Sequence, residues 1–357
     1  MAGAADVFLL PVGGESEAPV GPAGLARLID RIGLTGAAGP SRRWALKLTL
    51  GPRGRAPAVD PDWAASAAQA LAGPAARDRT VCCDTLSINL EGLDQVASHL
   101  ELAVAKGFGP GGAAPPYLVA DDPRHGDALR PAPDGPSLAA LTAAVDGLLV
   151  LNPVRPHPHL GFGGALFALG AGLADRDGKL MLHKDIRPKV DTPLCAGCGS
   201  CLAVCLFEAI RLNGGRATID HTLCTGCGEC MNVCFMAGIA PEAAVGIPRF
   251  QQRVAAAAEL ALAGAAGRPR PAGYLSFLVR LDRQSGGPAR RRDRLGDVGV
   301  LASRDPVALD RATWDLAAGG PLGALSAWSG FAAVPGPLLE AAADLGLGTP
   351  RYRLVTI

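Results

Sequence analysis

The chain of 357 residues has few aromatic side chains, little net charge and no long apolar run. Aromatic residues make up 4% of it, too few for a platform that stacks nucleic-acid bases. The formal net charge is +1, so neither a nucleic acid nor an anionic membrane surface is expected as the main partner. The longest apolar runs, such as Val254–Ala266, contain a charge or are too short for a membrane span.

Signals for secretion and for nucleotide binding are also missing. Met1–Pro11 has no basic residues ahead of its apolar run, so no signal peptide is evident, and we expect a soluble, cytoplasmic protein. The glycine-rich stretch Gly161–Gly172 fits neither G-x-G-x-x-G nor G-x-x-x-x-G-K-[ST], because Leu166 occupies the position of the third glycine. A site for a dinucleotide or a nucleoside triphosphate is therefore not supported.

Hydrophobic residues, by contrast, make up 49% of the chain, which is ample for a core. Short strand-like runs alternate with helical patterns on both sides of a cysteine-rich stretch, and this alternation predicts an α/β domain with a mainly parallel sheet. We expect that domain in two segments, residues 1–190 and 246–357, with a small α+β module of residues 191–245 inserted between them. The expected strands are 7–12, 44–50, 80–88, 117–121, 148–154, 274–281, 298–301 and 353–357.

The ten cysteines are unevenly distributed along the chain. Eight lie between Cys195 and Cys234, and the other two are the adjacent Cys82 and Cys83. A secreted disulfide scaffold would spread its cysteines over a much smaller chain, so the clustering predicts metal binding. Neighbouring residues of a strand face opposite ways, which favours core thiols for Cys82 and Cys83.

The cysteine-rich stretch is an internal repeat. Residues 195–210 read CAGCGSCLAVCLFEAI and residues 224–239 read CTGCGECMNVCFMAGI, with eight of 16 positions identical at an offset of 29. Each copy contains Cys-x2-Cys-x2-Cys-x3-Cys, with glycines that let the backbone wrap closely. Structural zinc sites favour Cys-x2-Cys pairs separated by longer gaps, so this spacing suits [4Fe–4S] clusters better. A hairpin over 210–219, turning at Asn213–Gly214–Gly215, is expected between the copies.

These residues resemble the two-cluster bacterial ferredoxin family over about 50 residues. The resemblance implies two [4Fe–4S] clusters as cofactors, with the fourth cysteine of each run serving the other cluster. Where that family usually has proline after the fourth cysteine, this chain has Leu206 and Phe235. The first cluster would be held by Cys195, Cys198, Cys201 and Cys234, and the second by Cys224, Cys227, Cys230 and Cys205.

Segments outside the repeat resemble a second family. They are GFGGALFALGAGLADRDGKLMLH (161–183), GFGPGGAAPPYLVAD (107–121), CDTLSINLEG (83–92) and GVLASRDPVALD (299–310). Together they are similar to the DUF362 family, iron–sulfur proteins of unassigned function, over most of the chain. Relatives commonly have Lys-Asn where this chain has Phe167 and Ala168, and many carry cysteines near Asp282–Ser285. The polar residues that match family-type positions are Lys47, Asp84, Thr85, His157, Lys179 and His183.

Two of these residues come at strand ends. A lysine in an apolar strand must pair or extend to the surface, so Lys47 faces either an anionic ligand or a carboxylate. Asp84 is a candidate general base, or else a turn cap. Because α/β proteins bind their ligands at the carboxyl edge of the sheet, we expect Lys47, Asp84 and His157 to converge on one cleft beside Gly161–Gly172.

Histidines supply the remaining candidates. His157 and His159 are metal ligands or acid–base groups, or else exposed loop residues. His183 precedes Cys195 by 12 residues and is expected between the cleft and the clusters, where it could tune one of them. The candidate catalytic residues are therefore Lys47, Asp84, His157 and His183.

Two functions fit these features. In the first, the chain is an oxidoreductase whose clusters exchange electrons with a ligand or substrate held by the α/β domain. In the alternative, it is a non-catalytic electron carrier or a partner subunit of a redox complex, which the departures at Phe167 and Ala168 keep open. A structural or sensing role for the clusters is a third reading. The expected partner is a redox protein or a small-molecule substrate, with no nucleic acid and no membrane span.

Overall fold

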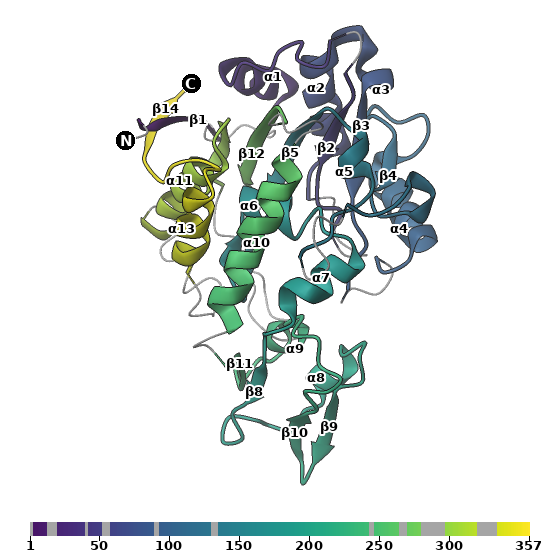
Figure 1. Ribbon diagram of the computed structural model, residues 1–357, viewed down its shortest axis with the longest axis vertical. Coiled ribbons are helices and arrows are strands. Elements are labelled where there is room, and N and C mark those ends of the chain that lie inside the picture. The colour runs from purple at the N-terminus through teal and green to yellow at the C-terminus, as the bar shows by residue number, and fades with distance from the viewer. Residues whose placement is uncertain are drawn as a thin grey trace.

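The computed structural model describes ten parts of the chain, and within them an eight-stranded sheet with helices on both faces narrows into a cysteine-rich end (Figure 1). No helix in these parts is both long enough and apolar enough to cross a membrane. The described residues are 3–12, 20–39, 42–51, 58–88, 93–129, 135–242, 246–263, 270–279, 297–319 and 334–357.

The large sheet has the strand order β14-β1-β13-β12-β5-β2-β3-β4. Every neighbouring pair is parallel except those of β13, which runs antiparallel to β1 and β12. The predicted α/β class with a mainly parallel sheet is thereby confirmed. The strands are β1 Ala5–Pro11, β2 Trp44–Lys47, β3 Thr80–Asp84, β4 Tyr117–Val119, β5 Gly147–Pro153, β12 Ala272–Leu278, β13 Gly299–Ser303 and β14 Tyr352–Thr356.

Two helical layers cover the sheet, and each layer encloses its own core. Because both faces are covered, β5 and β12 are buried along their whole length and mostly apolar. The adjacent cysteines enter different cores, Cys82 one and Cys83 the other, as predicted for neighbouring strand residues. One layer comprises α1 Pro22–Arg31, α2 Pro61–Ala72, α3 Ala76–Arg79 and α4 Val96–Ala103; the other comprises α5 Leu141–Ala144, α6 Ala165–Gly170, α7 Arg176–His183, α10 Gly246–Leu262, α11 Pro306–Gly319 and α13 Gly336–Asp344.

The cysteine-rich segment, residues 188–241, forms the narrow end. Its first and last strands pair antiparallel and close the segment at its base. The predicted hairpin over 210–219 is confirmed, with Gly214 and Gly215 both at positive φ in its turn. The elements are β8 Pro188–Val190, α8 Ser200–Ala203, β9 Ile210–Asn213, β10 Arg216–Ile219, α9 Glu229–Asn232 and β11 Ile239–Pro241.

The strands β2 and β3 are shorter than predicted. β2 ends at Lys47 rather than at residue 50, and β3 ends at Asp84 rather than at residue 88. The backbone N–H of Leu50 turns instead to the Asp84 carboxylate, 2.9 Å away. Side-chain pairing at the carboxyl edge therefore replaces the last rungs of the ladder.

Candidate functional site

The eight clustered cysteines line two separate cavities. The unfilled space, including the open mouth, is about 370 Å³ in the first cavity and about 350 Å³ in the second. Each takes three cysteines from one copy of the repeat and the fourth from the other copy. The first is lined by Cys195, Cys198, Cys201 and Cys234, and the second by Cys205, Cys224, Cys227 and Cys230.

Glycines shape both cavities. Gly197, Gly199, Gly226 and Gly228 all have φ between 66° and 85°, a region that favours glycine. A side chain at Gly197 would collide with the carbonyl oxygen of Gly215 in the hairpin turn. The backbone can therefore curl around each cavity only because these positions are glycine.

Backbone N–H groups point at sulfur atoms in the first cavity. The N–H of Ala217 donates to Sγ of Cys195 at 3.4 Å, and that of Gly238 donates to Sγ of Cys234 at 3.2 Å. Such donors stabilise negative charge on sulfur. In the described parts of the chain, no group of three or more His, Cys, Asp or Glu side chains is arranged to hold a single metal ion.

The two cavities differ in their surroundings. A Cβ atom on Gly226 would lie 2.7 Å from the carbonyl oxygen of His183, and one on Gly228 would lie 3.0 Å from Nε2 of His159. The equivalent of Gly228 in the first copy, Gly199, would meet only Cδ1 of Leu212 at 3.9 Å. The second cavity therefore borders the α/β domain, whereas the first lies away from it.

Three histidines surround Phe250 beside the second cavity, and we call His157, His159 and His183 the histidine group. Their ring centroids lie 6.0, 5.3 and 4.6 Å from that of Phe250, respectively. His159 also lies 5.6 Å from His157 and 5.9 Å from His183. The expected exposed loop position of His159 is wrong, because Phe250 of α10 and the cysteine-rich segment bury the ring completely.

Burial keeps the histidine group neutral. Burial lowers the pKa of His159 to about 3, helped by repulsion from His183, and that of His183 to about 4, helped by repulsion from the charged Lys179. The pKa of His157 also falls well below its ordinary value for the same reasons. None of the three rings is positively charged near neutral pH.

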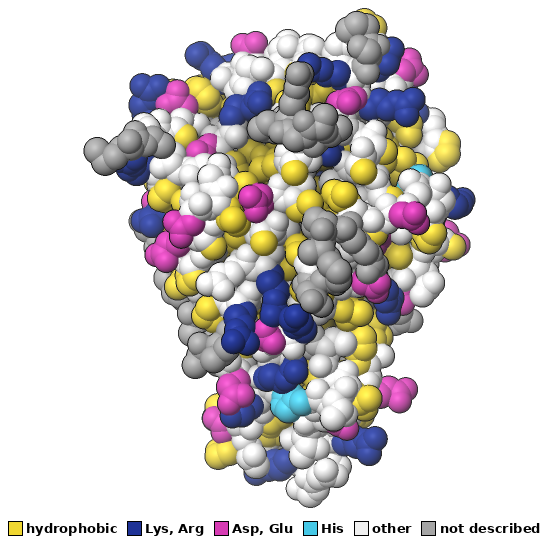
Figure 2. All heavy atoms as spheres, in the orientation of Figure 1, with side chains coloured by type: hydrophobic (Ala, Val, Ile, Leu, Met, Phe, Trp, Pro, Cys, Tyr) yellow, Lys and Arg dark blue, Asp and Glu magenta, His cyan; other side chains and the backbone are white. Residues whose placement is uncertain are grey.

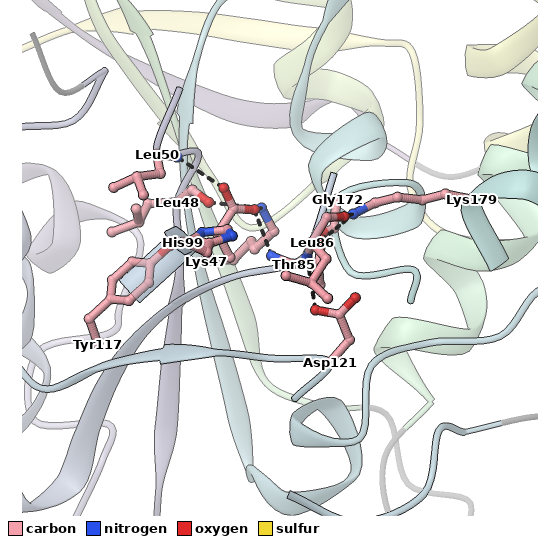
Figure 3. A network of polar contacts seen from close by, with 11 residues as sticks. Lys47, Leu48, Leu50, Thr85, Leu86, His99, Tyr117, Asp121, Gly172 and Lys179 are labelled. Carbon is pink, nitrogen blue, oxygen red and sulfur yellow. Dashed lines mark hydrogen bonds and ion pairs between the residues drawn. The ribbon is translucent and has the colours of Figure 1, made fainter. Parts of the chain in front are cut away.

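A second polar group lies at the carboxyl edge of β2, β3 and β4 (Figure 3). Nζ of Lys47 donates to Oδ1 of Asp84 at 2.9 Å and to the carbonyl oxygen of Leu48 at 2.8 Å. The lysine side chain is 1% exposed, so the pair is an internal ion pair. Burial alone would raise the pKa of Asp84, but Lys47 and backbone N–H donors hold it below its ordinary value. The buried lysine thus faces a carboxylate.

Lys179 of α7 reaches the same edge from the side. Its Nζ donates to Oγ1 of Thr85 at 2.6 Å and to the carbonyl oxygen of Leu86. Burial lowers the pKa of Lys179 to about 8, although Asp121 and Asp84 favour its charged form. We call Lys47, Asp84, Thr85, Asp121 and Lys179 the carboxyl-edge group.

Asp121, which sequence reasoning did not select, completes this group. It follows β4 and accepts the N–H of Leu86 through Oδ1 at 2.8 Å. Its Oδ2 is buried and has no hydrogen-bond partner among the described residues. Burial raises the pKa of Asp121, which Lys179 partly offsets. The only sequence signal was its position as the last residue of the predicted strand 117–121.

Within the described residues, the three side chains expected to share one cleft do not all meet. Lys47 and Asp84 meet at the carboxyl edge, but His157 contacts His159, Phe167 and Phe250 instead. The reason is the hairpin after β5, in which β6 Arg155–His157 pairs with β7 Gly161–Gly163 and turns His157 toward α10. The backbone of His183 lies against the second cysteine loop, since its carbonyl oxygen would be 2.7 Å from a Cβ atom on Gly226.

The sequence model of the family described as "Domain of unknown function (DUF362)" matches residues 45–315. This chain belongs to the DUF362 family. No curated protein matches it. Both polar groups and all eight clustered cysteines of this DUF362 protein lie within the matched residues.

A buried acid holds the helix that carries the departures from the DUF362 pattern. Asp310 is 1% exposed and accepts the N–H groups of Ala165 at 2.7 Å and Leu166 at 2.9 Å, which caps α6 from α11. On α6, Phe167 packs on His157 with ring centroids 4.6 Å apart. An apolar ring therefore borders the histidine group at this position. The departure near residues 282–285 lies outside the described residues.

Basic side chains gather where the α/β part of the chain meets the cysteine-rich segment, and Figure 2 shows them over the end of α7 and the start of α10. Arg249 and Arg253 both pair with Asp185, and Arg187 donates to the carbonyl oxygen of Lys184 at 2.9 Å. The cysteine-rich segment itself exposes large apolar side chains. These are Leu194, Leu202, Leu206, Leu212, Leu223, Phe235 and Met236.

Proposed function

We propose that this DUF362 protein binds two [4Fe–4S] clusters and passes electrons between them and a ligand held by the α/β domain. One observation carries the proposal: the duplicated cysteine runs line two cavities of similar size, four cysteines to each. Four thiolates are the ligand set of a [4Fe–4S] cluster, and the crossed sharing of the fourth cysteine is typical of two-cluster ferredoxins.

The chemistry of the cavities supports clusters rather than single ions. Each cavity offers four thiolates, which is the ligand set of one [4Fe–4S] cluster. The positive-φ glycines leave room close to the backbone, and N–H groups already point at Cys195 and Cys234. A cluster held in this way accepts and releases single electrons.

The position of the second cavity supports electron exchange with the α/β domain. From this cavity, contacts lead through Gly228 to His159 and His183, and along α7 to Lys179. Lys179 in turn bonds Thr85 at the carboxyl edge, where parallel sheets usually bind ligands. With a pKa of about 8, Lys179 can hold or release a proton near neutral pH.

A non-catalytic electron carrier is the second candidate, and the Lys47–Asp84 pair favours it. The pair satisfies the buried lysine without any ligand, since Lys47 bonds both Asp84 and the carbonyl of Leu48. Exposed apolar side chains of the cysteine-rich segment, such as Phe235 and Met236, would then serve to contact a redox protein.

Iron and sulfide analysis of anaerobically purified protein tests the clusters. We expect about eight iron and about eight acid-labile sulfide per chain. Zinc in place of iron would overturn the proposal, and about four iron would mean that one cavity holds no cluster.

Mass spectrometry of small molecules released from the same sample separates the two candidates. If the protein is an enzyme, the sample should contain a bound ligand, and the substitutions Lys179→Met and Asp121→Asn should weaken the binding of that ligand. A carrier should instead exchange electrons with a redox protein at rates that neither substitution changes.

A further inference from the structure

His159 is a buried polar side chain whose ring lacks hydrogen-bond partners within the described residues. The residue is fully buried, and neither ring nitrogen has a hydrogen-bond partner among the described residues. The backbone of Gly226 lies near enough to favour the charged ring slightly, but burial dominates and lowers the pKa to about 3. A neutral imidazole has one N–H donor and one acceptor nitrogen, and leaving both unpaired in the interior costs stability.

The ring cannot turn away to find water. The backbone N–H of His159 donates to Nδ1 of His157 at 3.2 Å, and its carbonyl accepts the side-chain amide of Gln251 at 2.9 Å. Gln251 is itself buried and accepts the N–H of Leu338 at 2.8 Å. Phe250 packs against the imidazole with an interplanar angle of 71°. The orientation of His159 is therefore fixed by three elements of the α/β domain.

That orientation directs Nε2 at the second cysteine loop. Gly228 lies close to the ring, between Cys227 and Cys230, and a Cβ atom there would lie 3.0 Å from Nε2. Gly228 lines the second cavity. The repeat supplies an internal comparison, because its counterpart Gly199 has a similar φ but meets only Leu212 at 3.9 Å. Within the described residues, an imidazole therefore lies against this glycine in the second copy but not against its counterpart in the first.

We propose that His159 is a positioning residue for the second cysteine site: it braces the loop at Gly228 and makes the reduction potential of that site higher than it would be without the imidazole. The inference rests on the proposed function. A polar N–H dipole beside a cluster favours its more negative, reduced state, and a firmly held loop keeps backbone N–H groups directed at sulfur. The first site has no such support and should not depend on His159.

The test uses the cluster-loaded full chain and a redox titration followed by electron paramagnetic resonance, which resolves the two sites. His159→Phe keeps a ring of similar shape but removes both nitrogens. We expect the ratio of reduced to oxidised second site at a fixed potential to fall about tenfold, equivalent to about 59 mV for one electron. The first site should keep its potential. His159→Gln, which restores a donor, should recover part of the shift.

The paired glycines give a control that leaves His159 intact. Gly228→Ala and Gly199→Ala introduce the same methyl group at a similar positive φ, so their backbone strain is comparable. The methyl group of Gly228→Ala would lie 3.0 Å from Nε2 of His159 and 3.1 Å from the flexible end of Met231, whereas that of Gly199→Ala meets only Leu212, so only Gly228→Ala should change the potential of the second site. If His159→Phe does not fold, His159→Gln and Gly228→Ala still decide the question.

Several results would overturn the inference. Unchanged potentials in His159→Phe, together with a higher free energy of unfolding, would show that the imidazole only fills space. Equal shifts at both sites would show an indirect effect on the whole segment. A wild-type chain without iron would instead overturn the proposed function, and the metal analysis reveals this before any titration.

Discussion

The carbonyl oxygen of Lys179 accepts a hydrogen bond from Nδ1 of His183, 2.7 Å away and one turn further along α7. Because a carbonyl can only accept, Nδ1 carries the proton and Nε2 of the neutral ring holds the lone pair. From the same helix, the Lys179 side chain reaches Thr85, whereas His183 packs against His159. A single helix therefore connects the carboxyl-edge group with the histidine group.

The Lys47–Asp84 pair should contribute to stability mainly by keeping each charge from being buried alone. Lys47→Met leaves the Asp84 carboxylate with the N–H donors of Leu50 and Thr85, so we expect a loss of about 3 kcal/mol in the free energy of unfolding. Asp84→Ala also strands both N–H groups and should cost about 5 kcal/mol. Urea denaturation of both variants measures these losses.

The double variant provides the control. Lys47→Met combined with Asp84→Ala leaves no unpaired buried charge, so its loss of stability should be clearly smaller than the sum of the single losses. Strictly additive losses would show that the two side chains do not stabilise one another.

Cys205→Ser should damage the second site although Cys205 belongs to the first copy of the repeat. Cys205 lines the same cavity as Cys224, Cys227 and Cys230, so the variant removes one thiolate from that cavity and none from the other. Electron paramagnetic resonance should show the first site intact and the second lost or altered. Cys234→Ser is the matched variant and should do the reverse. Loss confined to each residue's own run would contradict the crossed arrangement.

Local sequence patterns predicted the fold well. The pattern of alternating apolar runs depends only on residues that are close together in the sequence. It placed most strands and the hairpin over 210–219 correctly. The grouping of Lys47 with Asp84 was also within reach, because both residues were expected at the carboxyl edge of the sheet. Lys47 and Asp84 form an ion pair with each other because β2 and β3 are adjacent in the sheet, and the spacing of the residues along the sequence does not determine this adjacency.

The histidine group could not be derived in this way. His159 becomes buried only because Phe250, some 90 residues later, folds over it, and because Gly228 brings the second cysteine loop against the ring. Asp310 likewise caps a helix that lies about 145 residues earlier in the chain. Such long-range contacts leave no periodic signal in the sequence.

Lys179→Met should change how stability depends on pH. Burial lowers the folded-state pKa of Lys179 to about 8, against an ordinary value of 10.5. Between these values the unfolded chain binds more protons, so the wild type gains stability as the pH rises from about 8 to about 10.5. The methionine variant lacks this gain. Urea denaturation at both ends of this range should show the wild type improving relative to the variant, and a constant difference would contradict the shifted pKa.

Asp310→Asn should reveal the opposite dependence. Burial raises the pKa of Asp310 from 3.8 to about 7, although the N–H groups of Ala165 and Leu166 favour the charged form. The folded chain then binds more protons than the unfolded chain between about pH 4 and pH 7, so the contribution of Asp310 falls as the pH rises through this range. The decline is at most about 4 kcal/mol, at about 1.4 kcal/mol per pKa unit.

The variant isolates this effect from other titrating groups. Asparagine does not ionise, and it leaves one of the two α6 N–H groups without an acceptor, which costs roughly 1–3 kcal/mol at any pH. The stability of the wild type relative to the variant should therefore fall between pH 4 and pH 7 and stay constant above. Thermal or urea unfolding across this range measures the difference. An advantage that grows with pH would mean that Asp310 is ionised in the fold and that its two N–H donors outweigh its burial.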